Sequence, residues 1–560
     1  MNIDKKALEQ IRGRRKQMTD DFDPFKTKGY EIQQNVCPWR GRFLGGISES
    51  EDRGDAYDDS QIQNTFPIRA SQTAAAGIKS GISPSSRPWF RVEAEDKRVA
   101  EFAGPSAYLS AVERTLYAIF QRANVYDSLQ HAYQEIVDFG TGAAMVVPDV
   151  DTIIRLRPFT YGEYQLANDH KGNPNTFARS FYKSVSQLVG EFGEANVSSR
   201  TKDAHKNGKM EQRILCQCLI EPNDDRYAVK DALGRDFRAI YWEDGQPDEK
   251  ILSVRGFDNY PVLTGAWEAV GNQVYGYGLG HFNLRNCKRL QAMESDKLQQ
   301  LALSIKPPLL ANVSNKDTVV NTSPWGITHD LSGMSGTRPG VGPLYQVNPN
   351  TQAIEQSIQN TEKAIYDGFY NNIFMMIANS AEDIKTAYQT ARMMEEKYSV
   401  LGPVIERLQH MLGQLIKLTF AEALDRGLFP DPPPELEGQE LKIEYISILA
   451  QAQKISGLQS IEQTIGFVGQ AVDIWPEARH KVDILQAIDE IAQVNGTPAS
   501  VVRPDDEVDE MMAADAAAAQ QAKQAEQMQQ GAGMAKDLAG VNIQGNSALD
   551  VLAGAGASGQ

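Results

Sequence analysis

The cysteines and histidines are the side chains best able to bind a metal or act as nucleophiles, and their spacing favours neither role. Cys216 and Cys218 lie two apart in the strand-like segment 214–220, so both point to one face of that strand. A zinc site needs two more ligands nearby, and no such cluster is visible. The seven histidines are too far apart for a helical zinc pair. We therefore expect core thiols and no metal site.

Two glycine-containing segments bear a superficial likeness to nucleotide-binding loops. Gly77-Ile78-Lys79-Ser80 lacks the Gly-Lys-Ser order and the upstream glycine that bring a lysine to phosphates held by backbone amides. Gly276-Tyr277-Gly278-Leu279-Gly280 has the wrong glycine spacing, and no ribose-binding acid follows in a βαβ unit. The second segment better fits a turn that begins a helix. A nucleotide-using enzyme built on it stays open as an alternative.

Other catalytic signatures are missing from the sequence. The paired carboxylates Asp58-Asp59 and Asp505-Asp506 lie in polar stretches without a partner that would make them an acid and base. No Gly-x-Ser-x-Gly nucleophile elbow is present. We predict no catalytic residues and no cofactor, which is typical of a structural protein.

The charge balance narrows the class of function. The chain has 560 residues, with 56 Lys and Arg against 73 Asp and Glu, and a net charge of −17. This balance argues against a protein that grips duplex DNA through a basic surface, but it allows a pore that lets DNA pass. No apolar run reaches the roughly 18 residues of a membrane span, and no signal peptide begins the chain. We expect a protein made in a reducing cytoplasm, without membrane insertion.

The first half of the chain alternates helical and strand patterns. Helical periodicity predicts helices in the first third, and alternating apolar residues predict strands after them. The segment from Glu243 to Gln246 predicts a hairpin turn. The predicted helices are Leu8–Met18, Ala70–Ile82 and a helical region over 105–138. The predicted strands begin at Trp89, cover 143–147 and 153–156, and dominate 209–265.

Two amphipathic helices of similar length flank residues 309–350, which are rich in Gly, Pro, Ser, Thr and Asn. The first is predicted over His281–Lys306 and the second over Thr351–Ala378. A helix of about 26 residues spans roughly 39 Å, so the pattern indicates a helical stalk with a tip. The apolar stripe of the first helix consists of Leu290, Met293, Leu298, Leu301 and Ile305, and Lys288 and Lys306 lie on the opposite side.

The remainder of the chain is predicted to be mostly helical. A long helix is expected over Thr386–Leu428, with a kink at Gly402-Pro403. Further helices are expected over 440–512. The segment from about residue 511 is of low complexity, dominated by Ala, Gln and Gly, and its Gly-rich end is expected to be disordered.

Four stretches together resemble the head-to-tail connector, or portal, proteins of short-tailed bacteriophages. Their order and spacing carry the resemblance, which covers most of residues 60–435. The first runs from Arg69 to Phe90 and ends in Ser83-Pro84-Ser85-Ser86-Arg87-Pro88-Trp89-Phe90. The others are Phe139-Gly140-Thr141-Gly142 with Gly162-Glu163-Tyr164-Gln165-Leu166-Ala167 and Phe192-Gly193, then Tyr275-Gly276-Tyr277-Gly278, and last Leu401-Gly402-Pro403-Val404 with Leu428-Phe429-Pro430.

The resemblance implies an α+β, predominantly helical subunit with an α/β wing, a two-helix stem, a small clip at the stem tip and a helical crown. Mapped onto this chain, it gives an N-terminal arm (1–59), the wing (60–280, with the long helix 386–435), stem helix 1 (281–306), the clip (307–350), stem helix 2 (351–378), a tunnel loop (379–385), the crown (436–510) and a partly disordered tail (511–560).

The resemblance also implies the function. Such subunits form a dodecameric ring at one capsid vertex, which joins head to tail and conducts double-stranded DNA during packaging and ejection. The implied partners are other copies of the chain, the terminase motor, a tail adaptor, the major capsid and scaffold proteins, and DNA held without sequence specificity. The motor is a separate protein, which agrees with the missing phosphate loop. Another virion component, such as a tail adaptor or an internal ejected protein, is the alternative.

Site residues follow from this mapping, and none is catalytic. Glu294 and Lys297 interrupt the apolar stripe and are candidates for pairs between subunits. Alternatively, the channel lysines are ordinary solvated residues or form salt bridges. Trp325 could instead belong to a local core of the clip, and the tunnel loop could be a plain turn between two helices. The DNA-channel candidates are Lys288, Lys306, Asn379, Ser380 and Lys385, and the clip or adaptor candidates are Trp325, Arg338 and Tyr345.

Overall fold

A computed structural model describes most of the first 446 residues. The described ranges are 5–45, 59–94, 103–223, 234–245, 251–305, 309–311, 341–343, 351–379, 387–436, 441–446 and 464–469, with short pieces beyond 507. The chain divides into one compact unit of Met1–Arg91, Glu113–Phe429 and Ile443–Ser456, and a second of Val92–Val112, Pro430–Lys442 and Gly457–Gln560. The site described below lies within the first unit.

Two antiparallel sheets form the centre of the first unit. One has the strand order β4-β5-β6-β7-β8 and the other β3-β2-β9. Cys216 and Cys218 both lie in the same apolar cluster of the larger sheet, so the predicted core thiols are confirmed. The strands are β2 (Thr141–Asp149), β3 (Ile153–Phe159), β4 (Tyr164–Asn168), β5 (Pro174–Ser184), β6 (Arg213–Pro222), β7 (Phe237–Glu243), β8 (Ile251–Phe257) and β9 (Val262–Ala266).

Antiparallel hairpins set the register of the larger sheet, and one of them is predicted from the sequence. β7 pairs with β8 across the predicted turn, with Tyr241 opposite Ser253. β4 pairs with β5 across residues 169–173, where the Asp169 carboxylate accepts from the Lys171 and Asn173 amides. Two short helices, α7 (Val185–Phe192) and α8 (Ser199–Lys206), connect β5 to β6. Ser184 and Ser198 cap them by accepting from the Gln187 and Thr201 amides.

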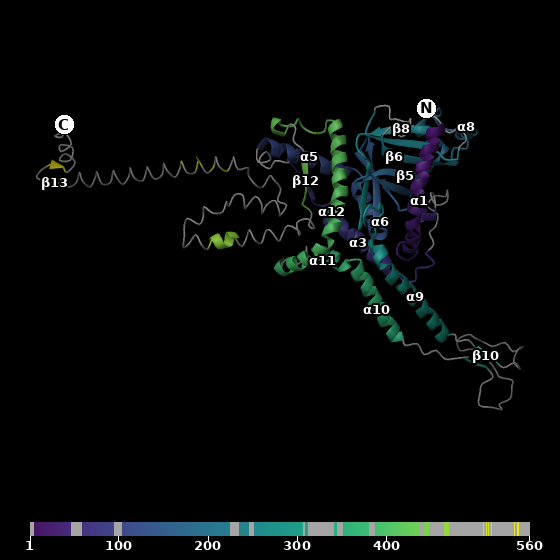
Figure 1. Ribbon diagram of the computed structural model, residues 1–560. Coiled ribbons are helices and arrows are strands. Elements are labelled where there is room, and N and C mark those ends of the chain that lie inside the picture. The colour runs from purple at the N-terminus through teal and green to yellow at the C-terminus, as the bar shows by residue number, and fades with distance from the viewer. Residues whose placement is uncertain are drawn as a thin grey trace. The chain divides into compact units, whose positions relative to one another are not determined.

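The N-terminal helix α1 (Lys5–Asn35) packs along the larger sheet (Figure 1). It is much longer than the predicted Leu8–Met18 and includes Pro24. Its first half buries Leu8 and Ile11 against Leu219 and Trp242 of the sheet. Its second half buries Phe22, whose ring lies 5.2 Å from Tyr161 and 4.9 Å from Tyr275. These tertiary contacts extend the helix beyond its own amphipathic pattern.

Two helices pack against the smaller sheet, α6 (Val125–Phe139) and α12 (Ala387–Asp425). α3 (Phe66–Ile82) packs against α6, and α5 (Ala103–Arg122) precedes α6. Strand β1 (Phe90–Ala94) follows α3, as predicted. α12 passes through Pro403 as one helix, in agreement with the long helix predicted there, and the kink at Gly402-Pro403 stays a prediction. The Leu408 and Met411 side chains of α12 lie against Gly265 of β9. The part of the helix that follows Pro403 is therefore packed against the smaller sheet.

The stem helices α9 (Leu279–Ile305) and α10 (Thr351–Gly368) lie side by side (Figure 1). The predicted second stem helix is broken, because α10 ends at Gly368 and α11 (Asn371–Asn379) begins after Tyr370, whose φ is 55°. A side chain at position 368 would overlap the Asn283 amide, and the Tyr370 ring stacks on Trp267 at 6.3 Å. Close packing against α9 and against Trp267, which follows β9, therefore accounts for the break.

Parts of the sequence-based predictions fall outside the described residues. At the clip, β10 (Leu309–Ala311) pairs with β11 (Val341–Pro343), and the rest of 306–350 is not described. The same holds for residues 380–386, for most of the crown and the tail, and for residues 46–58 of the N-terminal arm. Within the described residues, no helix combines the length and apolar character needed to cross a bilayer.

The segment that begins the predicted crown differs from the prediction. Helix is expected from residue 440, but Leu441–Tyr445 forms the strand β12. Its residues alternate between apolar and polar, which is the period of a strand. The Ile446 amide donates to the Trp89 carbonyl at 3.0 Å, and the Tyr445 hydroxyl donates to the Gln409 carbonyl at 2.5 Å. A short helix covers 464–469.

The glycine segment 276–280 joins the wing to the stem. α6 ends at Phe139 and is capped by Gly140, which has a φ of 85°. α9 begins at Leu279, so the predicted helix-starting turn is confirmed. A Cβ atom on Gly278 would lie 2.5 Å from the Gly140 amide nitrogen, 2.6 Å from the Val137 carbonyl oxygen and 2.7 Å from the Ile136 carbonyl oxygen. The glycines let two backbones touch at this point.

We predict that Gly278→Ala lowers the free energy of unfolding by about 1–3 kcal/mol or more, because every group that the new methyl meets is backbone. The measurement is urea unfolding followed by tryptophan fluorescence. The matched control is Gly190→Ala in α7, where no atom lies within 4 Å of the added carbon, and a small stabilisation is expected. Equal midpoints for the two variants would contradict the close backbone contact.

Candidate functional site

The base of the stem is held to the wing by a short segment that precedes α3. The Gln291 side chain of α9 accepts from the Gln63 and Asn64 amides at 2.7 and 2.8 Å and donates to the Asn64 carbonyl at 2.8 Å. The Asn64 side chain donates to Glu294 at 3.2 Å and to Glu362 of α10 at 3.0 Å. One asparagine therefore connects both stem helices to the wing.

The described stem residues that the sequence singles out have partners in the same chain. Lys297 bonds to Glu355 of α10 at 2.7 Å and lies 3.9 Å from Glu294. The bond to Glu355 raises the pKa of Lys297. Lys288 pairs with Glu31 of α1 at 3.1 Å. These ion pairs tie the two stem helices together and fix the stem against α1.

Most of the other predicted site residues lie outside the described part of the chain. Asn379 is the last residue of α11, and its side chain is not described. The remaining candidates outside the described residues are Lys306, Ser380 and Lys385 for the channel, and Trp325, Arg338 and Tyr345 for the clip.

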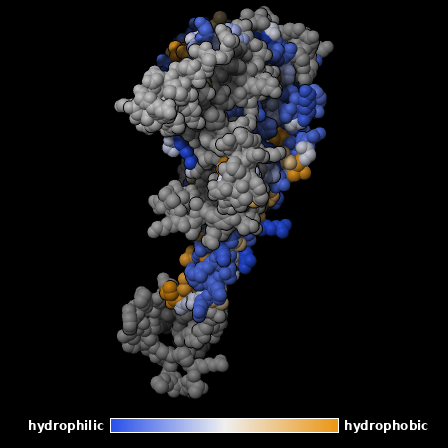
Figure 2. Space-filling model, turned by 90° about the vertical axis from the view of Figure 1, so that its left-hand side faces the viewer, coloured by the Kyte–Doolittle hydropathy of each residue, from blue (hydrophilic) through white to orange (hydrophobic). Residues whose placement is uncertain are grey.

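One face of α9 is buried near the wing and exposed toward the tip. Positions 287, 290, 294, 298, 301 and 305 share this face because they recur at intervals of three or four residues. Cys287 and Leu290 are fully buried, while Leu298 is 54% exposed, Leu301 38% and Ile305 74%. Figure 2 shows hydrophobic residues among the hydrophilic ones along the stem in the lower part of the view. Within one subunit, the predicted apolar stripe is therefore buried only in the half nearer the wing.

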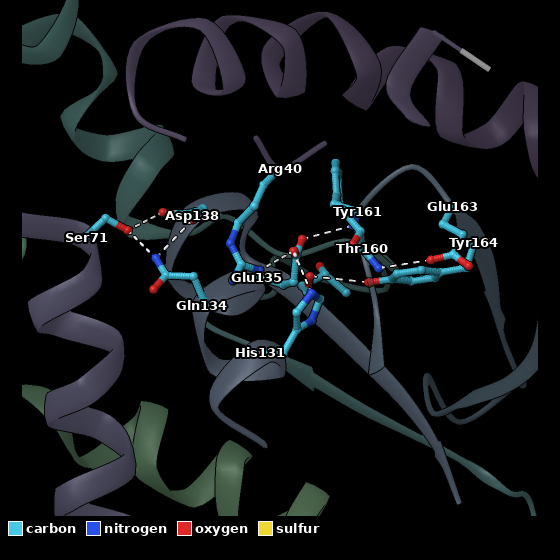
Figure 3. Close-up of polar contacts among 11 residues, drawn as sticks. Arg40, Ser71, His131, Gln134, Glu135, Asp138, Thr160, Tyr161, Glu163 and Tyr164 are labelled. Carbon is cyan, nitrogen blue, oxygen red and sulfur yellow. Dashed lines mark hydrogen bonds and ion pairs between the residues drawn. The ribbon is translucent and has the colours of Figure 1, made fainter. Parts of the chain in front are cut away.

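A buried polar network lies beside the wing end of the stem (Figure 3). The sequence alone does not reveal it. Glu135 of α6 is fully buried, and its carboxylate accepts from Arg40 at 2.6 Å and from the Tyr161 amide at 2.9 Å. Asp138, one turn along α6, accepts from the Ser71 hydroxyl of α3 and from Gln134 at 3.1 Å. The network joins α3, α6 and the segment after α1 immediately beside the α6–α9 junction.

Burial dominates the electrostatics of this network. It raises the pKa of Asp138 to about 6, against the opposing effects of Arg40 and the hydrogen bonds from Ser71 and Gln134. Burial also raises the pKa of Glu135 and lowers that of His131, which lies 4.0 Å from Glu135, to about 4. The arrangement positions helices. It lacks the paired, accessible acid and base of a catalytic site.

No group of His, Cys, Asp and Glu side chains suited to a metal ion occurs among the described residues. Cys37 and Cys287 lie near the network, and their buried thiols have raised pKa values because burial disfavours the thiolate. A sequence signal for the network is hard to find, because Arg40 and Glu135 are 95 residues apart.

Comparison with known proteins gives three consistent sequence matches. A family model described as "Bacteriophage head to tail connecting protein" matches residues 8–502. The chain is 34% identical over 545 residues to the portal protein of Salmonella phage epsilon15, with 96% of each chain covered. It is 31% identical over 544 residues to the probable portal protein of Bordetella phage BPP-1, with 95% of each covered.

Among solved structures, a chain from the neck of an empty gene transfer agent particle aligns with 73% of this chain and 86% of its own length, at 10% identity and a TM-score of 0.35. A chain from the virion of a native gene transfer agent particle aligns at 11% identity and a TM-score of 0.31, covering 71% of this chain and 96% of its own length.

We predict that Asp138→Asn changes how stability depends on pH. The native pKa of about 6 lies above the reference value of 3.8, so the native state holds the proton more tightly than the unfolded state does. The parent therefore gains stability relative to the variant as the pH falls from 7 toward 4, and loses it as the pH rises through 6. The full difference is at most about 3 kcal/mol.

Urea midpoints of both proteins at pH 7 and pH 5 measure this effect. Asp127→Asn, an exposed carboxylate at the start of α6, is the matched control and should show no such difference. A constant gap between the parent and Asp138→Asn across this pH range would contradict the raised pKa of the buried Asp138 carboxyl group.

Proposed function

The chain belongs to the family of bacteriophage head-to-tail connecting proteins, and on that basis we propose that it is the portal protein at one vertex of a phage capsid. There it forms a ring that joins the head to the tail and conducts double-stranded DNA. The sequence matches extend over almost the full length of both portal relatives, so the wing, stem and C-terminal region are all included.

The exposed half of the apolar face of α9 is the observation that supports a ring. Leu298, Leu301 and Ile305 form one continuous strip that the same subunit leaves in contact with solvent. A contiguous exposed apolar strip on an otherwise polar helix marks an interaction surface. In a closed ring, each stem lies against the stem of the neighbouring subunit. The apolar strip of every subunit therefore makes the same contact.

The acidic balance of the chain suits a channel through which DNA moves. A net charge of −17 repels phosphates and limits tight binding that would stall translocation. Lys306, Asn379, Ser380 and Lys385 are proposed to line the channel, and the pairing of Lys288 with Glu31 leaves that lysine a weaker candidate. Trp325, Arg338 and Tyr345 are proposed contacts of the clip with a neighbouring clip or a tail adaptor.

The proposed partners are a terminase motor, a tail adaptor, and the major capsid and scaffold proteins. A structural role without catalysis is favoured, because the glycine segment 276–280 is filled by backbone contacts with α6 and has no room for a nucleotide phosphate. These backbone contacts also argue against the alternative of a nucleotide-using enzyme built on residues 276–280. A tail adaptor or an internal ejected protein is disfavoured by the full-length match to portal proteins.

We predict that Leu301→Glu disrupts ring formation, because a carboxylate would be buried without a partner in every stem contact. The population of rings should fall by at least about tenfold relative to the parent. Native mass spectrometry and negative-stain electron microscopy measure it. The matched control is Val150→Glu, in the turn between β2 and β3, which is 91% exposed and should leave rings intact. Rings of equal abundance in both variants would contradict the stem contact.

We predict that Lys306→Ala combined with Lys385→Ala slows DNA packaging about two- to fivefold without affecting the ring, because screened surface charges each contribute little. The measurement is DNA protected from nuclease in capsids assembled with the variant. Lys171→Ala, in the exposed turn between β4 and β5, is the control. Packaging at the parent rate in the double variant would remove these lysines from the channel.

A further inference from the structure

A groove lined by cationic and aromatic side chains lies between the two sheets of the wing. Its main cavity has a volume of about 570 Å³ and takes residues from β2 and β3 on one side and from β5 to β8 on the other. A second cavity of about 470 Å³ adjoins it and shares Arg157, Arg179, Phe181, Lys183 and Glu191. We call the two together the basic groove.

The basic groove concentrates positive charge in an acidic protein. Five cationic side chains line the main cavity, and Glu191 is the acidic residue among its lining residues. The chain as a whole carries −17. An excess of positive charge in a cleft attracts anions and increases their rate of association. The cationic residues are Arg157, Arg179, Lys183, Arg235 and Arg255.

Aromatic rings of the groove fix the positions of these cations. The Arg179 guanidinium lies 4.9 Å from the centre of the Phe159 ring and 4.7 Å from that of Phe181. The Arg255 guanidinium lies 5.4 Å from the centre of Tyr241. Contacts of this kind hold a cation in place without neutralising it. The groove is therefore pre-organised for an anionic ligand.

The acids near the groove neutralise it only in part. Glu191 is shared, since it pairs with Lys183 and, at 3.2 Å, with Arg255. Arg179 pairs with Glu163 at 2.7 Å, yet its buried Nε atom has no hydrogen-bond partner. Burial, followed by the like charge of Arg157, lowers the pKa of Lys183 to about 8.

Arg157 is the cation of the groove best placed to meet a ligand. It is exposed on β3, and within the described ranges no ion pair or hydrogen bond holds its side chain. It lines both cavities. A ligand that spans the groove would pass this guanidinium, which is suited to bidentate contact with a carboxylate.

We propose that the basic groove binds an extended acidic segment of a partner protein. Two adjoining cavities with cations in both suit a chain of several carboxylates better than a single small anion. Single-stranded nucleic acid needs open aromatic faces on which bases stack. Here Arg179 lies over Phe159 and Phe181, and Arg255 lies over Tyr241, so cations already occupy these faces. Carboxylate side chains, by contrast, can bind to the cations without an open aromatic face.

Fluorescence anisotropy of the full-length protein tests the proposal, with labelled octaglutamate as the probe and labelled octathymidylate as the nucleic-acid comparison. Octaglutamate should bind at low salt, and Arg157→Glu should weaken its binding about tenfold or more, since a charge-assisted contact is replaced by repulsion. The matched control is Arg200→Glu on α8, which makes the same change of charge at an exposed position outside both cavities.

Binding of octaglutamate that Arg157→Glu weakens and Arg200→Glu preserves would support the proposal. Arg255→Glu, a second exposed position of the groove, should weaken it in the same way. The proposal is overturned by an absence of octaglutamate binding, or by equal weakening in Arg157→Glu and Arg200→Glu. Tighter binding of octathymidylate than of octaglutamate would overturn it in favour of a nucleic-acid ligand. None of these outcomes depends on ring formation.

Discussion

The close contact between the end of α6 and the start of α9 determines how the stem is joined to the wing. Backbone meets backbone there, with Gly278 beside Gly140 and no space for side chains between them. The Gly276 amide donates to the Thr141 hydroxyl at 2.8 Å, and the Trp267 amide donates to the Gly140 carbonyl at 3.0 Å. The direction in which the stem leaves the wing is set at this point.

A buried network of charged and polar groups surrounds that contact. Removing Glu135 and Asp138 from water is costly, and the cost is only partly offset by Arg40, Ser71 and Gln134. Apolar residues in the same places would pack without this penalty. Directional bonds, however, fix α3 and α6 in one arrangement relative to the stem. A precise stem angle matters in a ring, because an error in one subunit is repeated in every neighbour.

Much of the fold could be predicted from local patterns, and the exceptions have tertiary causes. The β7–β8 hairpin, the stem position and the helix-starting turn at 276–280 follow from periodicity and turn residues. The break at Gly368–Tyr370 does not, because it depends on Asn283 and Trp267, which are distant in sequence. The length of α1 depends on Phe22 packing against Tyr161 and Tyr275. The strand at 441–445 has a strand period, but it is only five residues long among helical neighbours.

The site was harder to predict than the fold. A heptad-like apolar stripe on the first stem helix is visible in the sequence, but which half of it the subunit itself covers depends on the wing. The basic groove has no linear signature, because Arg157, Arg179 and Arg255 come from three strands of two sheets and meet only in the folded chain. Glu294 and Lys297 stand out in sequence, and their partners Asn64 and Glu355 come from other elements.

A portal ring of these subunits would enclose an open channel, and native mass measurement combined with negative-stain electron microscopy of the purified full-length protein can detect it. We expect closed rings of about twelve subunits, with a central opening wide enough for a duplex of roughly 20 Å. A stable dimer with a closed centre, at protein and salt concentrations that keep the chain folded, would contradict this expectation.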